Sequence, residues 1–62
     1  MRSFLTVMRT EYAYALLFEG DEKKAGVIAK AFEERASSYP YKGDWEGEKE
    51  LMDRALSIYE TR

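Results

Sequence analysis

The sequence predicts an all-α fold, a three-helix bundle, on three observations. Apolar residues recur every three or four positions in three separate segments, which is the spacing of amphipathic helices. Glycine, serine, proline and aspartate are concentrated between these segments, and no run alternates apolar and polar residues as a strand does. A chain of 62 residues forms one domain, which buries only about 60% of the surface that its unfolded form exposes.

The first helix is predicted to begin after Ser3 as N-cap and to end at about Glu19, with Gly20 as its left-handed C′ residue. One apolar stripe consists of Phe4, Leu5, Met8, Tyr12, Ala15 and Leu16. A second stripe lies beside it across Glu11 and consists of Val7, Tyr14 and Phe18. Together they cover about half of the circumference, so this helix should pack against both others. Any part left uncovered is a homodimer contact or a docking face for sequence outside this chain.

The second helix is predicted to run from Glu22, with Asp21 as N-cap, to Ala36 or Ser37. The serines, Tyr39 and Pro40 then stop it, because a residue before proline is displaced from the helical region. Its apolar stripe is narrow and consists of Ala25, Ile28, Ala29, Phe32 and Ala36. The alanines permit a close approach of another helix, whereas Val27 falls on the polar side.

The third helix is predicted over Trp45 to Tyr59, with Asp44 as its N-cap. Its broad apolar face consists of Trp45, Leu51, Met52, Ala55, Leu56, Ile58 and Tyr59. The connecting segment before it gathers Tyr39, Tyr41 and Trp45 around Pro40. We interpret this segment as a joint whose aromatic side chains cover the open end of the bundle, with an aromatic binding platform as the alternative.

The stretch "ALLFEGDEKKAGVIAKAFEERASSYP" resembles a tetratricopeptide repeat, a helix-turn-helix unit of about 34 residues. Ala13 fits its small position, Gly20 its turn, Ala25 its buried alanine and Pro40 its stop, while Arg9 stands where the family has tryptophan. The resemblance covers about half of the chain. It implies an antiparallel hairpin, covered here by the third helix, and a protein-binding or assembly role. Any antiparallel helical hairpin with a glycine turn would share this pattern.

The composition argues against most kinds of catalytic, metal-binding and nucleic-acid-binding site. The chain has no cysteine and no histidine, so a thiolate metal site is excluded and the serines lack the usual activating base. Ten basic against 12 acidic residues give a net charge of −2, which argues against a nucleic-acid partner. A calcium loop counted from Asp44 would place Lys49 and Ala55 where glycine and glutamate are required. We therefore predict no catalytic residue, no cofactor and no metal.

Arg9 and Glu11 interrupt the most apolar stretch, "FLTVMRTEYAYALLF", well before the ~20 apolar residues that a membrane span needs. No direct membrane insertion is expected. The predicted location is cytoplasmic, with the soluble tail of a membrane-anchored protein as the alternative. Residues 1–62 are predicted to form a single helical domain, either complete or cut from a longer protein.

Two functions fit these observations. The first is a non-catalytic protein–protein interaction or assembly module, with a protein partner or a homodimer formed through the first helix. The alternative is a small-ligand-binding regulatory domain that uses the aromatic residues around the second joint, the segment between the second and third helices. The candidate interface residues are Phe4, Val7, Tyr14, Phe18, Tyr39, Tyr41 and Trp45.

Overall fold

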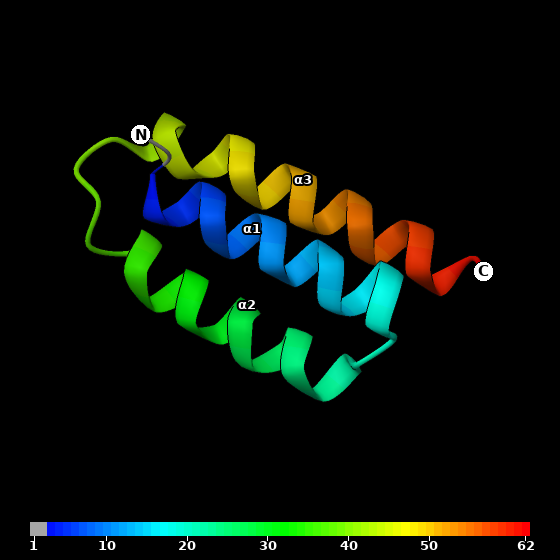
Figure 1. The fold of residues 1–62 in the computed structure, drawn as a ribbon. Helices are drawn as coiled ribbons and strands as arrows, with labels where there is room; N and C mark the ends of the chain where they lie inside the picture. The colour runs from blue at the N-terminus through cyan, green and yellow to red at the C-terminus, as the bar shows by residue number, and fades with distance from the viewer. Residues whose placement is uncertain (1–2) are drawn as a thin grey trace.

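The computed structural model describes residues 3–62 and confirms the predicted all-α three-helix bundle (Figure 1). The elements are α1 (Phe4–Tyr14), the π-helical turn η1 (Ala15–Glu19), α2 (Glu22–Ala36) and α3 (Lys42–Glu60). In Figure 1, α1 lies between α2 and α3, and it packs along both of them. The two outer helices approach each other much less closely. The first helix is thus the centre of the fold, as its wide apolar surface predicts.

Both predicted N-caps of the first hairpin are confirmed. The Ser3 hydroxyl accepts a hydrogen bond from the Thr6 N–H at 3.2 Å at the start of α1. The Asp21 carboxylate accepts one from the Lys24 N–H at 3.0 Å at the start of α2. Each cap satisfies a backbone donor that has no partner inside its helix, which stabilises the helix by about 1 kcal/mol.

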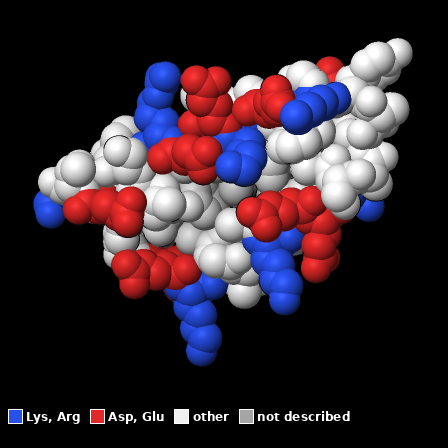
Figure 2. All heavy atoms as spheres, turned by 180° about the vertical axis from the view of Figure 1, so that it is seen from behind, with Lys and Arg blue, Asp and Glu red and all other residues white. Residues whose placement is uncertain are grey.

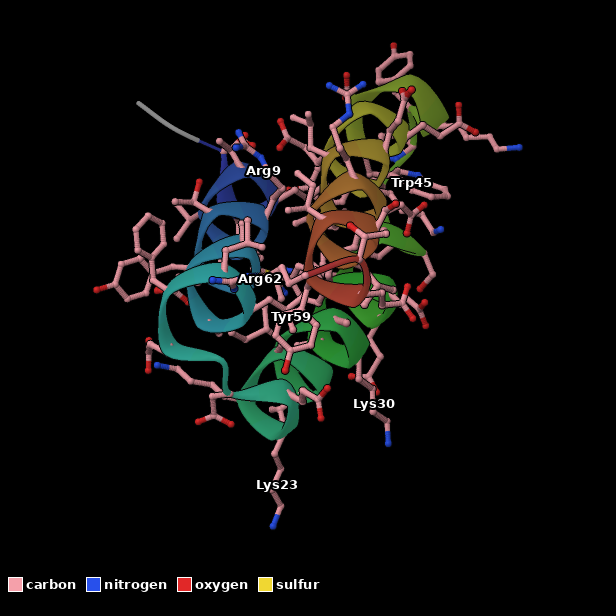
Figure 3. All side chains as sticks on the ribbon, turned by 90° about the vertical axis from the view of Figure 1, so that its right-hand side faces the viewer. Arg9, Lys23, Lys30, Trp45, Tyr59 and Arg62 are labelled. Atoms are coloured by element: carbon pink, nitrogen blue, oxygen red, sulfur yellow. The ribbon has the colours of Figure 1, made fainter. Side chains whose placement is uncertain are left out.

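The first helix ends differently from an ordinary α-helix. Gly20 is left-handed (φ 66°), as predicted, but the last turn before it is π-helical. The Asp21 N–H donates to the Ala15 carbonyl at 2.8 Å, and the Gly20 N–H donates to the same oxygen. Arg62, at the end of the chain, donates to the carbonyl of Leu17 at 3.0 Å (labelled in Figure 3). The guanidinium thus supplies one of the hydrogen bonds that a helix end lacks and ties α3 to η1.

The second helix ends at Ala36, within the predicted range. The Ser37 and Ser38 hydroxyls donate to the carbonyls of Glu34 and Arg35 at 2.7 and 2.8 Å. These bonds satisfy carbonyls of the last turn before the chain reaches Pro40. The N–H groups of Ser37, Ser38 and Tyr39 also donate to the carbonyls of Glu33, Arg35 and Ala36.

The predicted start of the third helix was wrong. It begins at Lys42, and Tyr41 takes the N-cap position with an extended backbone and no side-chain hydrogen bond. The Asp44 N–H donates to the Tyr41 carbonyl at 3.2 Å. Lys42 and Gly43 therefore belong to the first turn of α3 and not to the connecting segment. Asp44 lies inside this first turn, where its charge favours the positive end of the helix dipole.

The core follows the first stripe of α1 and the stripe of α2. Its buried residues are Leu5, Met8, Tyr12, Ala15, Leu16, Ala25, Phe32, Ala36, Met52 and Ala55. From α3 only Met52 and Ala55 are buried, while Leu51, Leu56 and Ile58 are exposed. The predicted apolar face of α3 is thus broader than the part that is buried, because α3 packs chiefly on α1.

Candidate functional site

Four of the predicted interface residues form an exposed stripe on α1 and η1. Phe4, Val7, Tyr14 and Phe18 are all exposed, from 39% for Val7 to 79% for Phe18. With Glu11, they follow one another at intervals of three and four residues, which places them on one face of the helix. The predicted second stripe, Val7, Tyr14 and Phe18, is therefore not part of the core. Phe4 was placed in the first stripe, which was wrong, because it is exposed on the same side as the second.

The C-terminal end of this stripe is an aromatic pair. The rings of Tyr14 and Phe18 stack with centroids 5.1 Å apart and planes at 19°. Phe18 lies in η1, and π-helical turns are frequent at functional sites. Two stacked rings that remain exposed offer a large apolar contact whose geometry is already set.

The side of α2 that borders this stripe extends it into a wider surface. One hollow of about 350 Å³ is lined by Phe4 together with Ala31, Glu34, Arg35 and Ser38 of α2 and the residues that follow it. A second, of about 420 Å³, is lined by Thr10, Glu11, Tyr14, Glu19 and Lys24. At the first hollow, the Arg35 guanidinium lies 4.7 Å from the centre of the Phe4 ring. At this distance the guanidinium makes a cation–π interaction with the ring.

We call this surface the α1–α2 face and define its apolar part as Phe4, Val7, Tyr14, Phe18, Val27 and Ala31. The sequence prediction omitted Val27 and Ala31. Val27 is 68% exposed and lies three residues after Lys24 and four before Ala31, on the same side of α2. That spacing was visible in the sequence, but whether these residues belong to a surface shared with α1 depends on how α1 and α2 pack.

The three aromatic residues around the second joint do not converge. Tyr41 is 72% exposed, whereas Tyr39 and Trp45 are half-buried and pack against the core. Trp45 points to the side of α3 near α2 (Figure 3) and lines a hollow of about 290 Å³ with Phe32 and Ala36, among others. Neither tyrosine lines that hollow. The segment joins the helices, and Trp45 packs against the edge of the core.

One charged cluster joins α1 to α3. Arg9 Nε donates to Glu48 Oε2 at 2.7 Å, and the Thr6 hydroxyl donates to the other carboxylate oxygen at 3.0 Å. The hydrogen bond from Arg9 is the chief cause that lowers the pKa of Glu48, against a partial desolvation that raises it. A general acid needs the opposite shift, so this cluster acts as a structural tie. Within residues 3–62, no three acidic side chains gather as a metal site would require.

Glu48→Gln is expected to lower the free energy of unfolding by about 1 kcal/mol at pH 7, because it removes a half-buried ion pair. The pKa of Glu48 is lower in the folded than in the unfolded state, so its contribution is complete above the unfolded pKa. It should disappear as the pH falls through the folded pKa. Urea denaturation at pH 7, 5 and 3 measures the difference from the unmodified protein.

The matched control is Glu50→Gln, at an exposed position two residues later in α3. It should change stability by less than about 0.5 kcal/mol at each pH. A Glu48→Gln difference that persists unchanged at pH 3 would contradict the role of the ion pair.

Comparisons with protein-family models, with curated proteins and with solved structures found no match to this chain. The likeness to tetratricopeptide repeats stays a prediction. Among the helices that the structure describes, none combines the length and apolar character needed to cross a membrane.

Proposed function

We propose that this domain is a non-catalytic protein-interaction or assembly module that self-associates through the α1–α2 face. The observation that carries the proposal is the exposed stripe on the central helix. The four large apolar side chains of α1 and η1 remain in water although this helix already packs against both of its neighbours. Covering each of them would contribute about 1–2 kcal/mol, so the face as a whole favours association.

The spacing of the stripe supports a helical partner. Phe4, Val7, Glu11, Tyr14 and Phe18 repeat at intervals of three, four, three and four residues, as the seam of packed helices does. No other helix of the described chain fills this seam.

The charges on the face support a second copy as that partner. Lys24, Glu34 and Arg35 lie at the α2 side of the face, and Glu11 and Glu19 lie at its α1 side. Lys24 already pairs with Glu19 at 3.3 Å, so Arg35 is the cation that Glu11 of a second copy would meet. When two copies meet with α1 of one against α2 of the other, carboxylates face cations across the contact. Such complementarity favours one arrangement over its alternatives.

Light scattering over 10–500 µM tests the proposal. The unmodified domain is expected to change from monomer to dimer within this range. The double variant Tyr14→Ser/Phe18→Ser should weaken the dimer at least tenfold, because it removes the exposed pair of stacked rings. Circular dichroism should show unchanged helix content, since both side chains lie outside the core.

The matched control changes two exposed apolar residues of α3, in Leu51→Ser/Ile58→Ser. It should leave the dimer dissociation constant within about twofold. A strict monomer at 500 µM would refute self-association. An equal loss in both double variants would refute the assignment to the α1–α2 face.

A further inference from the structure

We propose a second binding surface: the groove between α2 and α3 takes a basic amphipathic helix of a partner protein. This groove shares no lining residue with the α1–α2 face, so the inference stands independently of self-association. It is built from three hollows that run along the two helices. Their volumes are about 290, 60 and 230 Å³.

The hollows form one continuous groove because neighbouring hollows share walls. Phe32, Glu33 and Lys49 line both the first and the second. Tyr12 and Ala29 line both the second and the third. The groove therefore extends from Trp45 at one end of the bundle to Tyr59 at the other, and Figure 3 shows these two side chains well apart along α3.

The floor is apolar and the α2 wall is low. Ala25, Gly26 and Ala29 line the third hollow, so one side carries almost no side-chain bulk. A Cβ added at Gly26 would meet nothing within 4 Å, and Gly26 lies within α2. Glycine weakens a helix interior relative to alanine, and packing within the described chain does not require it here. An open glycine beside a groove permits the close approach of another backbone.

The rims are acidic on both sides. Glu22 and Glu33 line the groove from α2, and Asp53 and Glu60 line it from α3. The cation among the lining residues is Lys49, and its ammonium already lies 3.3 Å from Asp53. Figure 2, which views the molecule from behind, shows acidic side chains over both outer helices, interspersed with basic ones, and uncharged surface between the two helices. Lys23 and Lys30 of α2 point away into solvent (Figure 3).

Two tyrosines of the groove have pKa values that are raised first by desolvation and then by the neighbouring carboxylates. The pKa of Tyr12 is raised by burial and then by the charges of Asp53 and Glu60. The pKa of Tyr59 is raised by partial desolvation and then by the nearby Glu22 carboxylate, while the charge of Arg62 lowers it. Both rings line the groove, one near its middle and one at its end.

These features define the occupant. Because α2 has 15 residues, the groove is about 22 Å long, which corresponds to a helix of about four turns. Its apolar face would cover Ala29, Leu56 and Trp45, and its margins would carry Lys or Arg opposite the two acidic rims. Apolar contact provides affinity, and the charges select a basic helix over an acidic one.

Titration with two labelled synthetic peptides tests the proposal. One is an 18-residue amphipathic sequence of Leu and Lys, and the other has Glu in place of every Lys. We expect the Lys peptide to bind at least tenfold more tightly by fluorescence anisotropy, to gain helix content, and to change Trp45 fluorescence. Equal binding of the two peptides, absence of binding, or binding in an extended form would overturn the proposal.

Variants locate the site. Glu33→Gln/Asp53→Asn should weaken binding of the Lys peptide about tenfold. The control Glu34→Gln/Glu50→Gln removes two exposed carboxylates of the same helices outside the groove. The control should change the affinity for the Lys peptide less than twofold. Tyr14→Ser/Phe18→Ser should retain binding, which separates this groove from the α1–α2 face. Equal losses in the groove and control pairs would overturn the assignment.

Gly26→Leu provides a test that loss of stability cannot mimic. The leucine has open space and a higher helix propensity, so the thermal midpoint should rise. The added side chain should nevertheless reduce affinity for the Lys peptide at least fivefold, because it occupies the low wall of the groove. Undiminished binding by this variant would overturn the proposal of a close helix approach.

Discussion

Phe32→Ala is expected to lower the free energy of unfolding by about 3–5 kcal/mol, because it removes a ring from the centre of the core. Phe32 is 1% exposed and is one of the largest fully buried side chains in residues 3–62. A chain of 62 residues has a total stability of about 3–9 kcal/mol at the usual stability per residue. Deleting one central ring therefore removes between about a third and all of it. Urea denaturation followed by circular dichroism measures the loss.

Phe18→Ala is the matched control, since it removes the same atoms from a side chain that is 79% exposed. Its expected effect on stability is below about 0.5 kcal/mol. The two phenylalanines should thus separate folding from association: Phe32→Ala unfolds the monomer, and Phe18→Ala weakens the dimer while the monomer stays folded. Similar losses of stability in both variants would contradict the core described above.

The parts of the fold that depend on local chemistry could be predicted from the sequence. Ser3 and Asp21 are caps because a short polar side chain can reach a backbone N–H three residues ahead. Gly20 ends the first helix because it adopts a positive φ without steric cost. The narrow stripe of α2 gave the correct buried face, since a helix with few apolar residues has only one way to bury them.

The third helix shows where local rules conflict. Asp44 satisfies the rule for an N-cap, and it also suits the first turn of a helix that has already begun. The N–H of Asp44 bonds to the Tyr41 carbonyl, so the second possibility is the one adopted. The π-helical turn at Ala15 gave no signal in the apolar pattern, because the buried stripe before it is that of an ordinary helix.

The candidate site was predicted in part. Val7, Tyr14 and Phe18 were identified as a second stripe from periodicity alone, and Phe4 was assigned to the first stripe; the exposure of all four depends on the positions of α2 and α3. Val27 was interpreted as an isolated exposed residue, whereas it shares a side of α2 with Lys24 and Ala31, which line the two hollows next to that stripe. The groove between α2 and α3 combines residues from three helices, so no pattern within one segment reveals it.

Leu5→Ala is expected to lower the free energy of unfolding by about 2–5 kcal/mol, although Leu5 lies only two residues after the start of the described chain. Helix ends commonly fray, and substitutions there often have small effects. Leu5, however, is 1% exposed and belongs to the core cluster. The Ser3 cap holds the backbone of the same turn. Burial and capping together should make the first turn of α1 part of the cooperative unit.

Leu51→Ala makes the comparison quantitative, because it removes the same atoms from a leucine of α3 that is 40% exposed. It should cost less than about 1 kcal/mol, since only part of that side chain is removed from water. Hydrogen exchange gives a second readout for Leu5→Ala. If the first turn is cooperative with the core, the amides of Val7 and Met8 should lose protection together with those of α2. Loss of protection confined to the first turn, with stability unchanged, would show that α1 frays independently and that Leu5 does not anchor the bundle.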